Sequence, residues 1–201
     1  MARAPEADPD WELVARVADG EIDAFEPLVA CHQERLLRVC ERLLGDREAA
    51  RDATQEVFLK AFRKAGALEP QGRFFTWLYR VAVNHCLNRL RRRRLVRFVS
   101  FAGEREEGGG PAEPPAPGAD PEQALAARRR WQATRRALGR LPETQRAVLV
   151  LARFEGLSYR QIAAALEITE AAVESRLFRA LRALERAQES APPGVDRGEE
   201  R

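Results

Sequence analysis

Arginine side chains dominate the groups in this sequence that could do chemistry. Lys60 and Lys64 are the only lysines, so nearly all of the basic charge is guanidinium. The densest cluster lies between Arg89 and Arg97. Like charges held this close repel one another unless an anion relieves them, and phosphate is the usual anion. A GC-rich genome would explain the arginine count but not the clustering, so the cluster predicts a segment that binds nucleic acid.

Aromatic and amide side chains accompany this cluster. Residues 74–80 read Phe-Phe-Thr-Trp-Leu-Tyr-Arg, and Asn84, His85 and Asn88 follow them before the arginines. Aromatic rings beside a basic cluster suit the stacking of single-stranded bases. The alternative is that the rings, Phe74 and Trp77 above all, belong to a hydrophobic core.

A second candidate for DNA contact lies near the C-terminus, where two helical patterns are joined by a tight turn. Ser158 is a predicted N-cap for a helix over residues 159–166, and Thr169 for a helix over residues 170–186. Helices joined by so short a turn must pack at a steep angle, as in a helix-turn-helix.

The second of these helices divides into two faces. Its apolar stripe consists of Val173, Leu177, Ala180, Leu181 and Leu184, and should pack on Ile162, Ala163 and Leu166. The opposite face carries Ala172, Ser175, Arg176, Arg179 and Arg182. An α-helix fits the major groove, where arginine can bond a guanine edge or a phosphate. We therefore expect DNA contacts from Ser175, Arg176 and Arg179; the alternative is an ordinary amphipathic helix with a solvated arginine face.

A third pattern lies on the predicted helix from Asp46 to Lys64. One face is made of small and apolar residues: Ala50, Thr54, Val57, Phe58 and Ala61. The other carries Asp52, Gln55, Glu56, Leu59 and Arg63. An exposed leucine among polar residues suggests a protein-binding surface, although isolated exposed leucines are common and a merely solvated face is the alternative.

The elements that position these residues are helical, because strand patterns are nearly absent. We expect an all-α protein of 201 residues with two helical domains joined by a flexible linker. The predicted order is a disordered N-terminus (1–10), a helical domain (11–98), a Gly- and Pro-rich linker (99–120), a second helical domain (121–188) and a disordered tail (189–201). The first domain should hold helices near 11–18, 23–44 and 46–64, and one from Arg73 into the arginine cluster.

Several classes of function are not expected. His32 and His85 are the only histidines, and each is adjacent in the sequence to a cysteine. Adjacent side chains do not share a helix face, so neither His–Cys pair can act together. We expect no catalytic site, no metal site and no cofactor. Three cysteines without a pairing pattern argue against a disulfide framework and for the cytoplasm. No stretch is long enough to cross a membrane, and the start resembles no signal peptide.

Three segments together resemble the extracytoplasmic-function group of bacterial sigma factors. The first is residues 52–62, Asp-Ala-Thr-Gln-Glu-Val-Phe-Leu-Lys-Ala-Phe. The second is residues 74–92, from Phe-Phe-Thr-Trp to the arginines. The third is Leu141-Pro142 followed by Tyr-Arg-Gln-Ile-Ala at 159–163 and Val-Glu-Ser-Arg-Leu-Phe-Arg at 173–179. The resemblance covers roughly residues 18–97 and 121–187.

The resemblance implies a role for each segment. It assigns docking on the clamp helices of the largest polymerase subunit to Asp52, Gln55, Glu56 and Leu59. It assigns recognition and melting of the −10 promoter element to the loop 68–73 and the helix after it, with Leu68, Arg73, Arg80, Asn84, Asn88, Arg91 and Arg92. It assigns reading of the −35 element, beside the polymerase flap, to Tyr159, Arg160, Ala172, Ser175, Arg176 and Arg179. An anti-sigma factor is a typical further partner of the group.

The sequence departs from the group in four places. Leu68 stands where relatives often have an aromatic residue, and Glu167 replaces a common turn glycine. Ala172 and Glu174 stand where a threonine and a basic residue are frequent. These departures concern the promoter sequence that is read.

Three other functions are alternatives to this one. A helix-turn-helix regulator independent of polymerase would leave the 52–62 face and the aromatic-arginine helix unexplained. A nuclease would need clustered carboxylates or histidines. An adaptor that binds only RNA or protein would show no promoter-specific transcription.

Overall fold

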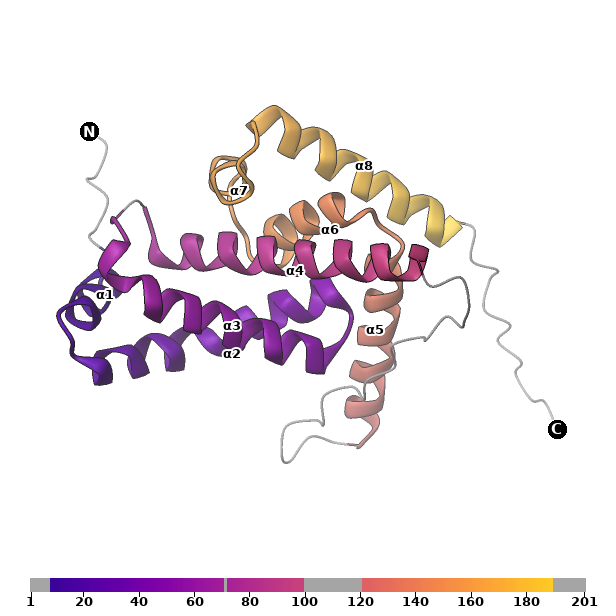
Figure 1. Cartoon of the computed structure of the whole chain (residues 1–201). Helices are drawn as coiled ribbons and strands as arrows, with labels where there is room; N and C mark the ends of the chain where they lie inside the picture. The colour runs from indigo at the N-terminus through magenta and orange to yellow at the C-terminus, as the bar shows by residue number, and fades with distance from the viewer. Residues whose placement is uncertain (1–7, 71, 100–120, 190–201) are drawn as a thin grey trace, which may run out of the picture.

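The chain is helical in every element of the part that the structure describes (Figure 1). A computed structural model describes residues 8–70, 72–99 and 121–189. The expected all-α class is confirmed. The predicted linker lies outside the described residues from residue 100 onward, and so do residues 1–7 and 190–201.

The first domain is built on three long helices. A short α1 (Asp10–Ala18) and the 3₁₀ turn η1 (Ile22–Ala24) lead into α2 (Phe25–Leu44), α3 (Arg47–Lys64), the turn η2 (Ala65–Ala67) and α4 (Phe74–Val99). Helix α2 packs against both α3 and α4. The helix expected from residue 23 is divided, since a 3₁₀ turn precedes α2.

Local signals place the ends of these helices. Gly45 closes α2 in the left-handed conformation (φ 70°), which glycine adopts without steric cost. Asp46 caps α3 as predicted, because its side chain accepts a hydrogen bond from the Ala49 amide at 2.9 Å.

Residues at the start of α1 and just before it contact the rest of the first domain. Asp8 Oδ2 accepts a hydrogen bond from the amide of Phe74 at 2.7 Å, and a carboxylate is favoured at a helix N-terminus. Asp10 Oδ2 lies 2.7 Å from Nε2 of the buried His32. Trp11 Nε1 donates to the carbonyl of Gly72 at 2.7 Å. Asp8 and Asp10, which the sequence analysis placed in the N-terminal segment 1–10, therefore contact α4 and α2 of the first domain.

The second domain holds the helix-turn-helix. It consists of α5 (Pro121–Gly139), α6 (Glu143–Leu149), the π-helical turn η3 (Val150–Phe154), α7 (Tyr159–Leu166) and α8 (Glu170–Glu189). Ser158 forms a capping box with Gln161 at the start of α7, and Thr169 Oγ1 accepts from the Ala172 amide at 3.2 Å. Both predicted caps are confirmed. Figure 1 shows α7 nearly end-on while α8 runs across the view.

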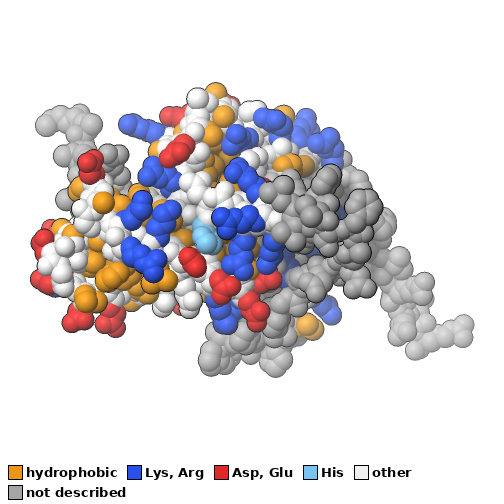
Figure 2. All heavy atoms as spheres, viewed as in Figure 1, with side chains coloured by type: hydrophobic (Ala, Val, Ile, Leu, Met, Phe, Trp, Pro, Cys, Tyr) orange, Lys and Arg blue, Asp and Glu red, His pale blue; other side chains and the backbone are white. Residues whose placement is uncertain are grey.

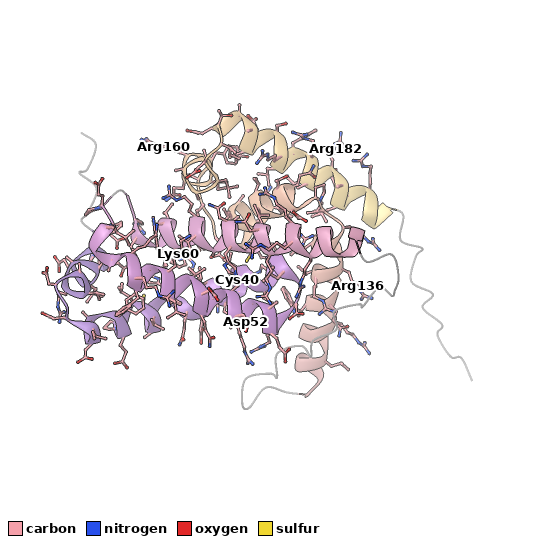
Figure 3. All side chains as sticks on the ribbon, viewed as in Figure 1. Cys40, Asp52, Lys60, Arg136, Arg160 and Arg182 are labelled. Atoms are coloured by element: carbon pink, nitrogen blue, oxygen red, sulfur yellow. The ribbon has the colours of Figure 1, made fainter. Side chains whose placement is uncertain are left out.

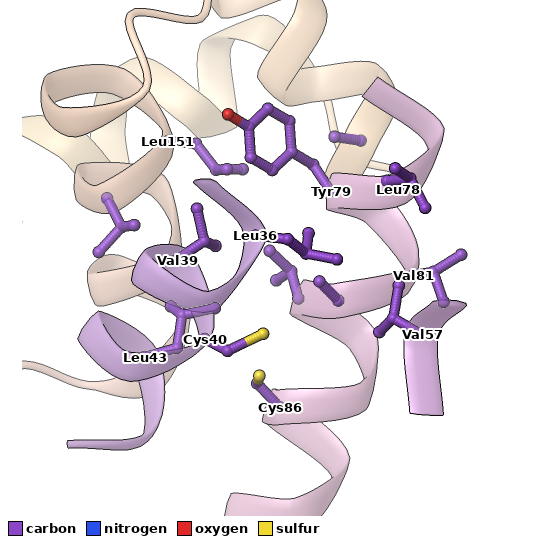
Figure 4. Close-up of a cluster of buried hydrophobic side chains, with 14 of the residues drawn as sticks. Leu36, Val39, Cys40, Leu43, Val57, Leu78, Tyr79, Val81, Cys86 and Leu151 are labelled. Atoms are coloured by element: carbon purple, nitrogen blue, oxygen red, sulfur yellow. The ribbon is translucent and has the colours of Figure 1, made fainter. Parts of the chain in front are cut away.

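The two domains share one hydrophobic core, which the sequence did not predict. Segments α6 and η3 of the second domain pack against α2 and α4 of the first. Figure 4 shows Leu151 of η3 beside Tyr79 of α4, and both side chains are fully buried. The buried Arg146 of α6 donates to the carbonyl of Leu43 at the end of α2.

Candidate nucleic-acid interface

The faces of α8 match the predicted division. The predicted apolar stripe lies inward: Val173, Leu177 and Ala180 are buried, and Leu181 and Leu184 are half-buried. On the opposite face Ser175 and Arg179 are exposed, while Ala172 and Arg176 are half-buried. The guanidinium of Arg179 folds back on its own helix, donating to Ser175 Oγ at 2.9 Å and to the Ser175 carbonyl at 3.2 Å. It must therefore turn outward to reach a base.

The other two candidates of the helix-turn-helix lie on α7. Tyr159 and Arg160 are both exposed. Arg160 borders a hollow that α7 forms with the first domain, rather than joining the Ser175–Arg179 group. Figure 3 labels Lys60 and Arg160, which come from α3 and α7 on either side of α4.

This upper hollow, between α7 and the first domain, gathers three of the residues expected at the −10 element. It has a volume of about 610 Å³ and is lined by Leu68, Arg73, Thr76, Trp77 and Arg80 of the first domain, and by Arg160 of the second. Trp77 is half-buried, whereas Phe74 is buried and belongs to the core. Arg80, on the wall of this hollow, also pairs through Nη1 with Glu167 Oε1, in the turn after α7, at 3.5 Å.

A second hollow of about 610 Å³, the lower hollow, lies between α3 and α4 and carries most of the remaining −10 candidates. Its α4 wall includes Asn84, His85, Asn88, Arg89 and Arg92, and its α3 wall includes Glu56, Lys60, Arg63 and Lys64. Figure 2 shows Lys and Arg side chains gathered over this part of the visible face. An excess of cations beside amide side chains suits a phosphate.

Burial and the charges around it shift the pKa of His85 in the lower hollow. Its pKa is lowered, first by burial and then by the positive charges of Arg89, Lys60 and Arg92, while Glu56 acts in the opposite direction. The imidazole is therefore held neutral at neutral pH.

Sequence reasoning missed the basic wall of this hollow. Lys60, Arg63 and Lys64 recur at helical spacing on α3, and this was the available signal. This spacing indicates a basic wall only together with the position of α4 beside α3 in the folded protein. Arg91, by contrast, borders neither hollow, and its Nη1 donates to Asn88 Oδ1 at 3.4 Å.

The predicted polymerase-docking residues of α3 are all exposed: Asp52, Gln55, Glu56 and Leu59. Half of the Leu59 surface is accessible (50%), although the side chain is large and apolar. The other face of α3 is buried as predicted. Asp52 Oδ2 pairs with Arg89 Nη2 at 3.3 Å, which links this surface to the basic side of α4.

His32 and two of the three cysteines are buried in the first domain. The ring of His32 stacks on Phe75 with centroids 4.7 Å apart. Cys31 is exposed, and the buried Cys40 and Cys86 face each other in the core (Figure 4). Within the described ranges, no three His, Cys, Asp or Glu side chains are grouped as a metal site would require. No helix in those ranges is long and apolar enough to cross a membrane.

Comparisons with known proteins agree over both domains. The family profile described as Sigma-70 region 2 matches residues 28–96, and the profile described as Sigma-70, region 4 matches residues 131–184. The chain is 36% identical to the RNA polymerase sigma-H factor of Pseudomonas aeruginosa over 89% of this chain and 93% of that protein. It is 33% identical to the ECF RNA polymerase sigma-E factor of Escherichia coli over 88% and 92%.

Two solved structures have the same fold. CnrH, in complex with the cytosolic domain of CnrY, superposes with a TM-score of 0.67 at 27% identity, covering 92% of this chain and 99% of that one. The sigma factor RpoE of Bartonella quintana, in complex with the anti-sigma factor NepR, gives 0.63 at 21% identity, covering 83% and 98%. On these matches and on the placement of its two helical units, the chain belongs to the sigma-70-type RNA polymerase sigma factors, in their extracytoplasmic-function group.

Proposed function

We propose that this sigma factor binds core RNA polymerase through α3, opens the −10 element with the first domain and reads the −35 element with the helix-turn-helix. In this proposal it acts in the cytoplasm and transfers promoter specificity to the polymerase, with the chemistry of RNA synthesis left to the core enzyme. A regulator that works without polymerase is not favoured.

The observation that carries the proposal is the exposed face of α3. Leu59 is half accessible beside the exposed Asp52, Gln55 and Glu56, on a helix whose other face is fully used by the core. A DNA-binding regulator has no need for an acidic and apolar face, because carboxylates repel phosphate. A surface that binds another protein does use such groups. We propose that this face binds the clamp helices of the polymerase.

The first domain supports strand opening through its two hollows along α4. Trp77, Arg73 and Arg80 can receive an unstacked base in the upper hollow. The basic wall of the lower hollow, with Asn84 and Asn88, can hold the backbone of the same strand. Opening the duplex costs stacking and pairing energy, which such contacts offset.

The second domain supports reading of duplex DNA. Ser175, Arg176 and Arg179 lie on the outer face of α8, in the half nearest the turn, where a recognition helix reaches base edges. We propose that the polymerase flap supports this domain on the −35 element. We also propose an anti-sigma factor as a regulatory partner; the solved relative CnrH is in complex with the cytosolic domain of CnrY.

The test compares two exposed apolar residues. Leu59→Ala should weaken binding of the full chain to core polymerase about fivefold to thirtyfold, since truncating a central side chain of an interface costs about 1–2 kcal/mol. The matched control is Ile22→Ala, which removes a more exposed side chain (67%) away from α3. Binding is measured by fluorescence anisotropy, and promoter use by run-off transcription from a pool of genomic promoters.

The proposal makes both measurements decisive. Core polymerase with the wild-type chain should transcribe from a limited promoter set, and Leu59→Ala should lose this activity at concentrations where Ile22→Ala keeps it. Equal binding by the two variants would remove α3 as the docking surface. No promoter selectivity from the wild-type chain would overturn the proposed function itself.

A further inference from the structure

A tryptophan from the first helix lines the hollow proposed to receive an unstacked base. Trp11 of α1 is half-buried and borders the upper hollow together with Leu68, Gly72, Arg73 and Trp77. Helix α1 packs against η2 (Figure 1), which brings Trp11 to this place. Within the part of the chain that the structure describes, Trp11 and Trp77 supply the only aromatic rings along the hollow.

A hydrogen bond ties the indole of Trp11 to the segment that leads into α4. Its Nε1 donates to the carbonyl of Gly72 at 2.7 Å, although the two residues are 61 positions apart. Gly72 lies at a bend with φ of 69°, a left-handed conformation that favours glycine. The start of α4 is also held, because Asp8 accepts from the Phe74 amide. The indole therefore has a fixed orientation on the wall of the hollow.

Ring contacts support both tryptophans on the same buried side chain. Phe74 lies edge-on to Trp11, with ring centroids 5.4 Å apart, and stacks on Trp77, with centroids 6.0 Å apart. Phe74 is buried, whereas both tryptophans are half-buried and border the hollow. A binding surface that is ordered in advance loses less conformational entropy when a ligand arrives. The two tryptophans therefore form a preorganised surface for a flat ligand.

We propose that Trp11 is a stacking residue for the unstacked −10 base, held in place by its hydrogen bond to Gly72. The inference rests on the proposed function, because it concerns the hollow in which that base is captured. The volume of the hollow, about 610 Å³, lies within the roughly 300–1,000 Å³ of small-ligand sites and leaves room for a base. Leu68 lines the hollow without a ring, so Trp11 and Trp77 are the surfaces on which a base can stack.

The polar groups of the hollow suit the rest of a nucleotide. Arg73 and Arg80 line it, and arginine side chains bond phosphate oxygens. Thr76 adds a hydroxyl that can donate to or accept from a base edge. Because Nε1 of Trp11 is already bonded to Gly72, Trp11 contributes its ring surface and no hydrogen bond to the base. Its effect should therefore be similar for all four bases, since every base has a π-face.

A purely structural role for Trp11 makes a different prediction. If the indole only packs on Phe74 and holds Gly72, its loss should weaken binding of every DNA equally, including DNA that lacks the captured base. A stacking role instead couples Trp11 to one base. Removing the ring and that base together should then cost no more than removing either one alone, which is the signature of a direct interaction in a double-mutant cycle.

The test measures this coupling in holoenzyme assembled from core polymerase and the full chain. The probe is a labelled promoter that wild-type holoenzyme selects in the run-off assay, with its non-template strand left unpaired across the −10 element. An abasic site is placed at each −10 position in turn, and binding is measured by fluorescence anisotropy. Trp11→Leu should weaken binding to the intact probe about tenfold, as expected for the loss of one base–ring stack.

One −10 position should reveal the coupling. An abasic site there should weaken binding of wild-type holoenzyme about tenfold, for the same lost stack. The Trp11→Leu holoenzyme should bind this abasic probe as well as it binds the intact one. Trp11→Phe keeps a ring and lacks the Nε1 donor, so its affinity for the intact probe should lie between those of the wild type and Trp11→Leu.

The matched control is the same substitution at another half-buried tryptophan. Trp131→Leu changes α5, away from the upper hollow, and should leave both affinities at the wild-type level. If Trp11→Leu yields no folded protein, Trp11→Met takes its place, because a flexible thioether chain fills irregular space without offering a ring.

Three outcomes would overturn the stacking role of Trp11 while the holoenzyme still selects promoters. The first is wild-type affinity for the intact probe in the ring-less variant, and the second is equal weakening on the intact and abasic probes at every position. The third is Trp11→Phe that binds as weakly as Trp11→Leu. A wild-type chain that gives core polymerase no promoter selectivity is a separate result, seen before any variant is compared, and it overturns the proposed function itself.

Discussion

At the scale of single residues, tertiary surroundings separate side chains that look alike in the sequence. Glu56 and Glu155 are both single carboxylates with apolar residues close by in the sequence. Glu56 is exposed on α3, and Glu155 is buried with three donors around it. Asp8 and Asp10 likewise form an ordinary acidic pair in the sequence, but Asp8 accepts a hydrogen bond from the amide of Phe74 at the start of α4, and Asp10 bonds His32.

His85 carries a prediction for the pH dependence of stability. Its pKa in the folded protein is lowered by burial and by neighbouring cations, so it lies below the unfolded value of about 6.5. The unfolded chain then takes up the proton first, and the free energy of unfolding falls as pH drops through the unfolded pKa, levelling off below the folded one.

The measurement is urea unfolding between neutral pH and about pH 5. His85→Gln should lose less stability over this range than the wild-type protein, because the substituted side chain does not titrate. Equal losses would show that His85 does not contribute to the pH dependence. The reference variant is Cys31→Ser, an exposed change that leaves both histidines in place.

At the scale of elements, amphipathic spacing decides which face of a helix is available for partners. Helix α3 buries its small and apolar face and leaves Leu59 outside, and α8 buries the stripe from Val173 to Leu184. The capping box at Ser158 and the cap at Thr169 fix where α7 and α8 begin, and so which residues form the first turns of each helix.

The outer face of α8 carries the prediction at this scale. Arg176→Ala or Arg179→Ala should cost about 1–3 kcal/mol on the preferred −35 sequence and less on mismatched sequences, if these side chains read bases. Binding is measured by anisotropy of holoenzyme on labelled −35 duplex variants. Arg136→Ala, which removes an exposed arginine from α5, is the charge-matched control. A uniform loss on every sequence would assign the arginine to phosphate contact instead.

At the scale of the whole molecule, two family domains behave as one folded body. The hydrophobic core runs from α1 to α8 without a break between domains. Polar links, with Glu155 and Arg146 as the buried ones, fix their relative placement. This arrangement predicts that the two domains unfold together.

The three tryptophans allow this to be tested. Trp11 and Trp77 lie in the first domain and Trp131 in the second. The readout is tryptophan fluorescence during urea unfolding. A Trp131→Phe variant keeps only the tryptophans of the first domain, and a Trp11→Phe, Trp77→Phe double variant keeps only that of the second. Their urea midpoints should coincide in the wild-type background and separate when Glu155→Gln is added. Distinct midpoints in the wild-type background would show that the domains unfold independently.

The sequence by itself determined the helices and the family. Periodicity and caps located α3, α7 and α8 and their inner and outer faces, because both signals are local and act within a few residues. The motif segments at 52–62, 74–92 and 159–179 carried the family resemblance that the comparisons then confirmed.

Only the tertiary structure decided how the two domains meet. Tyr79 and Glu155 are 76 positions apart, and Arg35 and Glu155 are 120 apart. Periodicity shows that a face is apolar but not which surface covers it, so the shared core was invisible to it. The same reason hid the lower hollow, whose basic wall on α3 gains meaning only opposite α4. Long-range pairing is a property of the folded chain, and no local pattern encodes it.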